Sequence, residues 1–249
     1  MENKKTNYSY IGIAFIILVF GIIFVPRIVD RVKNHSIVEN DRLNIPTQKD
    51  SKLKNDLAYI EINGKAKKVP SFNFTDQNGK TITNKDYEGK VYIVEFFFTT
   101  CPTICPRMSS NLVQIQEAFE AFNNFGVASF TINPEHDTPE ILKDYADQYG
   151  MNNPNWHLMT GKEKEIYKLA NEGFNLYTAK DGELEGGFEH SGNFALIDKN
   201  GFIRSRKDAS GNPLIYYNGI ISESEKVDDQ GQSEEISILK EDIAKLLQE

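Results

Sequence analysis

The sequence is poor in cysteine, with only Cys101 and Cys105 among its 249 residues. Two cysteines so close together cannot cross-link a large fold, so they need a local explanation as a redox pair, a metal-binding pair or a coincidence. Long basic runs are also missing, and 28 Lys and Arg against 36 Asp and Glu give a formal net charge of −8. Without basic clusters to neutralise phosphates, we do not expect a nucleic-acid partner.

Charge is absent from residues 11–25, which have the sequence IGIAFIILVFGIIFV. Counted as a helix from Tyr8, the segment is roughly 27 Å long, close to the ~30 Å hydrocarbon core of a bilayer. No small-x-small cleavage site follows it and no cysteine is available for lipidation, which favours a retained anchor over a cleaved signal peptide. We therefore predict a transmembrane anchor over residues 1–29. Lys and Arg flank both ends, so charge alone does not fix its orientation.

Residues 30–56 are polar and lack both hydrophobic periods, which predicts a linker. The predicted folded domain is residues 57–249, since 39% hydrophobic and 26% charged residues are ordinary for a globular chain. Two extended stretches before the QNGK turn at residues 77–80 predict early β-hairpins. The apolar run VYIVEFFF at residues 91–98 predicts a central strand covered on both faces.

Helical and strand patterns then alternate, which is typical of α/β layers. A helix is predicted over residues 107–123, followed by a buried strand, GVASFTI, from Gly126. The apolar positions of this helix are Met108, Leu112, Ile115, Ala118 and Phe119. Thr138 and Pro139 begin a second helix that runs to about Tyr149.

The rest of the chain continues the alternation. NWHLMT is a short predicted strand and GKEKEIYKLANEGF, residues 161–174, another helix. Two alternating runs around Lys199-Asn200-Gly201 predict a hairpin, and an amphipathic helix closes the chain. Its apolar face consists of Ile236, Leu239, Ile243 and Leu246.

The cysteines lie where the central strand ends and a helix begins, in the segment FFFTTCPTICPRMSS. Ligands and reactions collect at this edge of a sheet. With Cys105 in the first helical turn, both sulfurs can face one side, and helix N-terminal amides favour thiolate over thiol. Pro102 and Pro106 stiffen this loop. The spacing is one residue longer than the Cys-x-x-Cys of redox enzymes, which favours metal capture.

Five segments resemble the Sco (SenC) family of copper proteins, which assist cytochrome c oxidase assembly. In order they are VPSFNFTDQNGKTIT, FFFTTCPTICP, TINPEHDTPEILKDY, NWHLMTG and EHSGNFALIDKNG. The resemblance covers about residues 69–206. The family commonly has Asp and Arg where this chain has Asn133 and His136, so an ion pair between those positions is not expected here.

The resemblance implies a thioredoxin-like fold, with a central mixed sheet flanked by helices, and one bound copper ion, Cu(I) or Cu(II). Its implied ligands are Cys101, Cys105 and His190. Two thiolates and an imidazole form a soft set that suits Cu(I) and accepts Cu(II), whereas zinc prefers a fourth ligand. The implied partners are the copper-bearing subunit of cytochrome c oxidase, an external thiol reductant and the outer face of a bacterial cytoplasmic membrane.

Three other residues that could ligate a metal are assigned other roles. We expect His136, in a polar turn, and His157, beside Trp156, to have surface or packing roles. Met159 is expected in the core.

Glu95 interrupts the apolar central strand, where a carboxylate is costly unless it is paired or protonated. It lies six residues before Cys101, the offset at which thioredoxin-like proteins carry a buried acid. It either handles protons for the cysteines or pairs with a lysine or hydroxyl in a structural role.

Two enzyme classes are the alternatives to a metallochaperone. A membrane-anchored thiol–disulfide oxidoreductase would use Cys101 as nucleophile, but His190 stands where thioredoxins place a proline opposite their cysteines. A peroxiredoxin-like peroxidase needs Thr or Ser three residues before its cysteine, where this chain has Phe98. We therefore predict a metallochaperone, with the thiol–disulfide oxidoreductase as the alternative.

Overall fold

The computed structural model describes Ala14, Leu18–Phe20 and residues 57–62, 64–176, 178–180, 188–208 and 211–249. The chain divides into two compact units, residues 1–53 and 54–249. Apart from Ala14 and Leu18–Phe20, which are helical, the predicted anchor and linker lie outside the described residues. In the described ranges, no helix combines the length and apolar character needed to cross a membrane.

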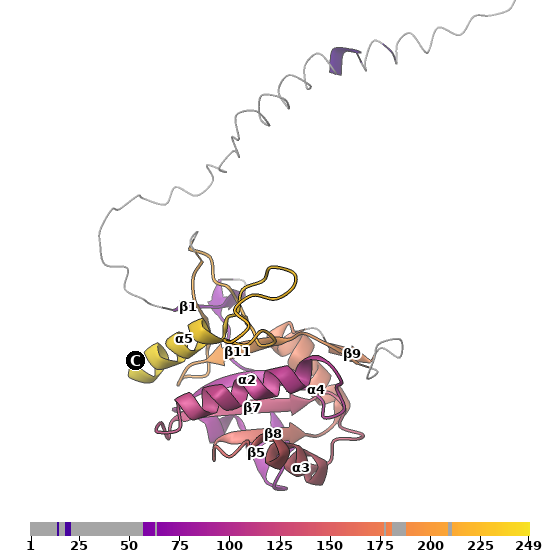
Figure 1. Cartoon of the computed structure of the whole chain (residues 1–249), viewed down its shortest axis with the longest axis vertical. Coiled ribbons are helices and arrows are strands. Elements are labelled where there is room, and N and C mark those ends of the chain that lie inside the picture. Colours follow the sequence, from indigo (N-terminus) through magenta and orange to yellow (C-terminus); the bar gives the residue numbers. More distant parts are fainter. Residues whose placement is uncertain are drawn as a thin grey trace, which may run out of the picture. The chain divides into compact units, whose positions relative to one another are not determined.

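Three parallel strands form the centre of the main sheet (Figure 1): β6 (Val91–Phe97), β7 (Phe125–Thr131) and β8 (Trp156–Thr160). β6 and β7 are buried along their whole length, as expected for strands covered on both faces. The sheet order is β1-β12-β11-β6-β7-β8-β4-β5, with β13 also paired to β11. The other strands are β1 (Ala58–Tyr59), β4 (Asn73–Asp76), β5 (Thr81–Thr83), β11 (Asn193–Ile197), β12 (Ile203–Ser205) and β13 (Tyr217–Asn218). A separate small hairpin joins β2 (Glu61–Ile62) and β3 (Lys65–Ala66).

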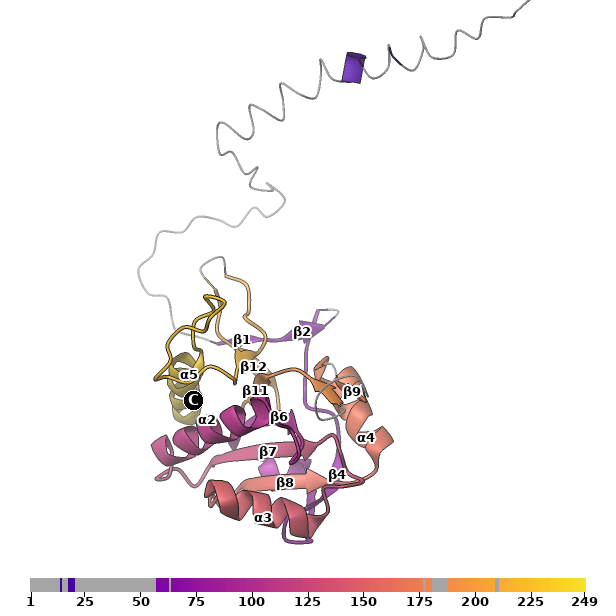
Figure 2. The ribbon, with the colours of Figure 1, turned by 45° about the vertical axis from the view of Figure 1, so that its right-hand side comes forward.

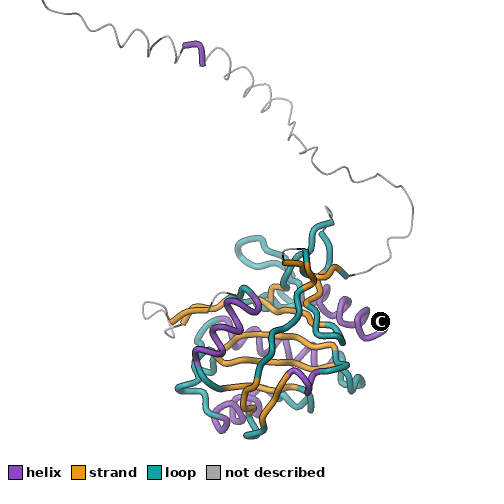
Figure 3. Tube along the Cα trace, turned by 180° about the vertical axis from the view of Figure 1, so that it is seen from behind, coloured by secondary structure: helices purple, strands orange, loops and turns teal. Residues whose placement is uncertain are grey.

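Helices cover both faces of the sheet (Figures 2 and 3). They are α2 (Ile104–Ala118), α3 (Pro139–Tyr149), α4 (Glu163–Lys168), the π-helix η2 (Leu169–Phe174) and α5 (Ile236–Gln248). The ring of Phe97 contacts Tyr145 of α3, whereas the ring of Phe96 contacts Phe174 of η2. Because neighbouring strand residues point to opposite faces, α3 and η2 lie on opposite sides of the sheet. α2 packs against both α3 and α5.

The turns of two hairpins have the same arrangement of an aspartate and a glycine. Asp76 Oδ1 accepts from the N–H groups of Asn78 and Lys80 in the β4–β5 turn, at 2.9 and 2.8 Å. Asp198 Oδ1 accepts from the N–H groups two and four residues later in the β11–β12 turn. Gly79 and Gly201 have φ of +73° and +80°, the left-handed region that glycine adopts at no steric cost. Both predicted hairpins are confirmed.

The first predicted helix is shifted. α2 begins at Ile104 rather than residue 107, because Pro106 is tolerated in a first turn, where its missing N–H is not needed. α2 also ends at Ala118 rather than at residue 123, and Ala118 is exposed although it keeps the helical spacing of the apolar residues. The η1 turn (Asn84–Tyr87) precedes β6. The predicted buried face of the C-terminal helix is confirmed at Ile236, Leu239, Ile243 and Leu246.

Candidate metal centre

The cysteine loop joins the end of β6 to α2. Neither cysteine forms a disulfide, and both are buried, with 7% of Cys101 and 1% of Cys105 exposed. Thr103, the residue before α2, makes no capping hydrogen bond with its side chain. The sulfur of Cys101 takes that role, accepting from the Cys105 N–H with 3.5 Å between nitrogen and sulfur. Cys105 therefore lies in the first helical turn, as predicted.

Burial controls the protonation of Cys105 in the metal-free chain. It raises the pKa of the Cys105 thiol, and the neighbouring Cys101 and the charge of Glu95 raise it further. Burial therefore opposes the thiolate that the amides at the helix N-terminus are expected to favour. A bound cation would replace the proton, since thiolate ligands are deprotonated on binding.

A buried carboxylate holds the start of the cysteine loop. Asp137 is 0% exposed and accepts from the Thr99 N–H at 3.1 Å and from Thr99 Oγ1 at 2.5 Å. The same carboxylate also bonds to Thr131 Oγ1 and to His136 Nδ1. Thr99 lies two residues before Cys101, so Asp137 ties the loop to the turn after β7. The sequence offered no direct signal for this pairing across 38 residues.

Glu95 lies on β6 with 1% of its surface exposed. Its Oε1 accepts from Ser129 Oγ at 2.6 Å, and Ser129 Oγ accepts from Trp156 Nε1 at 3.0 Å. Its Oε2 has no hydrogen-bond partner among the described residues. Burial raises the pKa of Glu95 to about 7, although the Ser129 hydrogen bond opposes the shift. Ser129 is the hydroxyl partner that is expected if Glu95 has a structural role. The raised pKa fits the other hypothesis, in which Glu95 handles protons for the cysteines.

The backbone of His190 lies at the end of β10 (Phe188–His190), which pairs with β9 (Thr178–Lys180) so that His190 is opposite Thr178. The His190 side chain is outside the described residues. A ring contact and a close approach of the backbone place its segment beside the cysteine loop. The ring of Phe98, three residues before Cys101, lies 5.0 Å from the ring of Phe188, measured between centroids.

The second feature lies on the other side of His190. A Cβ built on Gly192 would be 3.7 Å from Cδ1 of Ile104, the residue before Cys105, so Gly192 lies near the start of α2. The Phe188–Phe98 ring contact and this proximity therefore place the residues before and after His190 beside the two ends of the Cys101–Cys105 loop.

His136 and His157, the other histidines among the described residues, have partners away from this loop's sulfurs. His157 Nδ1 lies 2.9 Å from Asp76 Oδ2 with its ring against Tyr87, and His136 pairs with Asp137. Met159 is fully buried, as predicted. The described side chains contain no group of three or more His, Cys, Asp or Glu that could hold a metal, and His190 is not among them.

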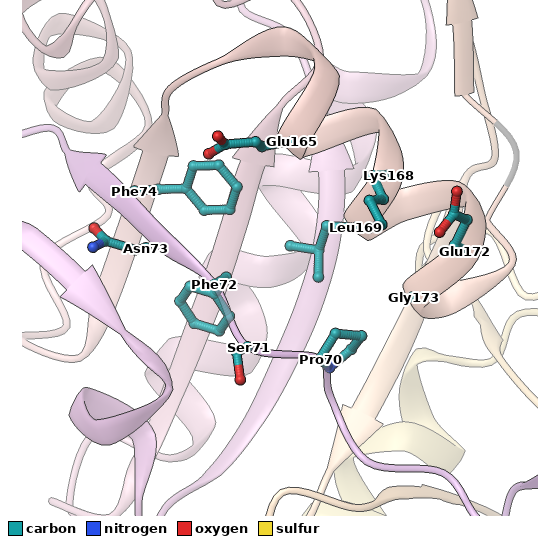
Figure 4. Close-up of a pocket in the computed structure, with 10 residues that line it drawn as sticks. All are labelled: Pro70, Ser71, Phe72, Asn73, Phe74, Glu165, Lys168, Leu169, Glu172 and Gly173. Atoms are coloured by element: carbon teal, nitrogen blue, oxygen red, sulfur yellow. The ribbon is translucent and has the colours of Figure 1, made fainter.

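A groove of about 590 Å³ lies elsewhere on the domain, between the β4 region and the α4–η2 helices (Figure 4). Phe72, Phe74 and Leu169 contribute its apolar lining, and Glu165 and Lys168 add charged groups. Neither cysteine lines it. The groove therefore does not belong to the candidate metal centre.

Comparison with known proteins identifies similar sequences. Residues 60–222 match the family described as SCO1/SenC. A SCO1 protein homolog of Bacillus subtilis is 33% identical over 157 residues, which are 62% of this chain and 80% of that protein.

Solved structures agree with this result. A SCO1/SenC family lipoprotein from Bacillus anthracis is 30% identical, with a TM-score of 0.58 over 72% of this chain and 94% of that one. BsSco, described as a member of the Sco family of cytochrome c oxidase assembly proteins with a disulfide switch, is 26% identical, with a TM-score of 0.58 over 73% and 94%. Bradyrhizobium japonicum ScoI with copper bound is 22% identical and shares the fold, with a TM-score of 0.54 over 71% and 98%. The predicted thioredoxin-like α/β fold is confirmed.

Proposed function

The chain belongs to the SCO1/SenC family, and on that premise we propose that it is a copper metallochaperone whose ligands are Cys101, Cys105 and His190. The observation that carries the proposal is that the residues on both sides of His190 lie beside the cysteine loop. Phe188 packs on Phe98, and Gly192 lies beside Ile104. Residues 85 or more positions apart in sequence thereby meet at the cysteine loop.

The donor set suits copper as cargo. Copper-bound structures exist in this family, including B. japonicum ScoI. Two thiolates and one imidazole form a soft, roughly trigonal set for Cu(I), and the imidazole also makes Cu(II) acceptable. The burial of both cysteines would shield the bound ion from water and from competing thiols.

The recipient and the location follow from the family. BsSco belongs to the cytochrome c oxidase assembly proteins, and we propose that this chain delivers copper to the copper-bearing subunit of that oxidase. The B. anthracis relative is a lipoprotein, but this chain has no cysteine before Cys101 that could carry a lipid. Residues 1–29 would serve as a single-pass anchor instead, with the domain on the outer side of the bacterial cytoplasmic membrane.

Redox state should control copper loading. Forming a Cys101–Cys105 disulfide releases two protons and two electrons to an oxidant and removes both thiolate ligands. The loop already brings the two residues together, because the Cys101 sulfur lies 3.5 Å from the main-chain nitrogen of Cys105. Outside the cytoplasm an external thiol would have to return those electrons before copper binds.

The alternative function is a thiol–disulfide oxidoreductase, and Glu95 is the observation that favours it. A buried carboxyl with a pKa of about 7 that acts electrostatically on Cys105 is the kind of group that moves protons during thiol exchange. The metallochaperone uses the same cysteines but needs one reduction for each ion delivered.

One experiment separates the two functions. Copper affinity is measured for the reduced and the oxidised full-length chain, beside the rate at which the chain reduces insulin with a dithiol as electron donor. We expect tight binding of one copper by the reduced form only, and slow turnover. Fast turnover with equally weak copper binding by both forms would overturn the metallochaperone and favour the oxidoreductase.

A further inference from the structure

Asn111 connects the cysteine helix to the segment that carries His190. It lies on α2, six residues after Cys105, and only 1% of it is exposed. Its Nδ2 donates to the carbonyl oxygen of Gly219 at 2.9 Å. A buried side-chain amide that bonds to main chain 108 residues away has a specific tertiary partner rather than a role in its own helix.

Gly219 in turn bonds to the segment that carries His190. Its N–H donates to the carbonyl oxygen of Gly192 at 2.7 Å. Gly192 lies two residues after His190 and immediately before β11. The path from α2 to the His190 segment therefore consists of two hydrogen bonds, Asn111 to Gly219 and Gly219 to Gly192.

Close packing also joins the Gly192 segment to the Gly219 segment. A Cβ on Gly219 would lie 2.6 Å from ring atoms of Phe194, and a Cβ on Gly192 would lie 2.2 Å from Ile220 Cδ1. A larger residue at either glycine would therefore require the side chain of Phe194 or Ile220 to move. The β11–β13 pairing, with Phe194 opposite Tyr217, fixes the register of the segment that ends at Gly219.

We propose that Asn111 is a positioning residue of the metal centre, which through Gly219 sets the place of His190 relative to the helix that carries Cys105. The inference rests on the proposed function. Asn111 is not itself a proposed ligand, but on this proposal it determines whether His190 can reach a copper ion held by the two cysteines. We call the Asn111–Gly219–Gly192 connection the brace.

Gln116 provides a matched control. It is a second buried amide on α2, with 4% exposed, and it bonds to Gly150 and to the N–H groups of Asn152 and Asn153. Those partners follow α3 and have no connection to the His190 segment in the hydrogen bonds described. Both Asn111→Leu and Gln116→Leu remove side-chain hydrogen bonds and should destabilise the fold. The effect should be larger for Asn111→Leu, because Gly219 is buried whereas Gly150 and Asn152 are exposed.

The test compares these variants of the full-length chain in two ways. In the metal-free chain, hydrogen exchange at residues 188–194 should be about tenfold faster in Asn111→Leu, as expected for the loss of roughly one hydrogen bond, and unchanged in Gln116→Leu. On Cu(II) titration, Asn111→Leu should lose about tenfold in affinity and shift the thiolate-to-copper absorption, while Gln116→Leu keeps the wild-type spectrum. If Asn111→Leu does not fold, Asn111→Ser, which is too short to reach Gly219, gives the same comparison.

Equal rates of hydrogen exchange at residues 188–194 in Asn111→Leu and Gln116→Leu would refute the proposed role of Asn111. So would a wild-type Cu(II) spectrum and affinity in Asn111→Leu. A wild-type chain that binds no copper would refute the proposed function instead, and the exchange rates of the metal-free chains would then decide the brace alone.

Discussion

The main-chain N–H of Cys105 donates to the sulfur of Cys101, with 3.5 Å between nitrogen and sulfur. The sulfur thereby acts as the N-terminal cap of α2, a role that serine, threonine, aspartate or asparagine usually fills. One atom therefore has two functions, as a proposed copper ligand and as a local stabiliser of the helix. The two functions can be separated by substitution.

We predict that Cys101→Ser and Cys101→Ala both lose tight copper binding but differ in stability. Serine keeps an acceptor for the Cys105 N–H, whereas alanine removes it. Replacing a capping side chain by alanine costs about 1 kcal/mol, so Cys101→Ala should be less stable than Cys101→Ser by that amount. Chemical denaturation of the two metal-free variants measures the difference. Equal stabilities would show that the sulfur does not cap the helix.

We predict a stability that falls as pH rises, because of Glu95. Its pKa is raised to about 7 in the folded chain from an ordinary 4.5, so the native state holds this proton more tightly than the unfolded state. The resulting stabilisation is fully present below pH ~4.5 and is lost as pH rises through ~7. Denaturation midpoints from about pH 5 to pH 8 should show a loss of about 2–3 kcal/mol from this group.

Glu95→Gln is the test of that assignment. The variant cannot ionise, so this part of the pH dependence should disappear, and the variant should gain stability relative to the wild type as pH rises. Ser129→Ala serves as a control that keeps the carboxyl but removes its hydrogen bond at 2.6 Å. It should raise the pKa of Glu95 further. If Glu95→Gln keeps the wild-type pH dependence, Glu95 is ionised throughout.

We predict that Glu95→Gln also makes the cysteine pair ionise more easily. The negative charge of Glu95 contributes to the raised pKa of Cys105, after burial and the neighbouring Cys101. Removing that charge should move the pH profile of thiol alkylation to lower pH. A profile that overlays the wild type, together with a lower melting temperature, would mean that Glu95 has only a structural role.

We predict that Asp137→Asn loosens the cysteine loop. The carboxylate accepts from both the N–H and the hydroxyl of Thr99, and an amide has one acceptor oxygen instead of two. Leaving a buried donor unpaired costs about 1–3 kcal/mol. The cysteines should become more accessible, which alkylation under native conditions detects.

Asp76→Asn is the matched control for this change. Asp76 is also a buried aspartate that bonds to main-chain N–H groups and to a histidine, His157, but its turn joins β4 to β5. We expect a similar loss of stability from both variants and faster alkylation only in Asp137→Asn. Equal alkylation rates would mean that global unfolding, rather than the loop, exposes the cysteines.

Local patterns predicted much of the fold because their physical causes are local. The apolar run at residues 91–98 is β6, and Thr138 with Pro139 begins α3 where the capping rule requires. The end of the first helix was misplaced because Phe119 continues the apolar period although the hydrogen bonding of α2 stops there. Helix ends depend on which carbonyls find donors, which periodicity does not report.

The metal site was predicted through motifs rather than through geometry. The resemblance named Cys101, Cys105 and His190, but no local rule joins residues 85 positions apart. Asn111 was missed for the same reason, since a polar residue within a helix has no sequence signal that distinguishes a solvent contact from a buried tertiary bond. Only the fold shows that its amide reaches Gly219.

The central claim is that His190 completes a copper site with the two cysteines. Anaerobic titration of the reduced full-length chain with Cu(I) and Cu(II), followed by absorption spectroscopy, tests it most directly when His190→Ala is compared with His157→Asn as a histidine control. We predict one copper per chain, Cu(II) charge-transfer bands in the wild type and in His157→Asn, and a His190→Ala variant that binds Cu(I) weakly and has lost the Cu(II) site. Unchanged Cu(II) bands and affinity in His190→Ala would contradict the account.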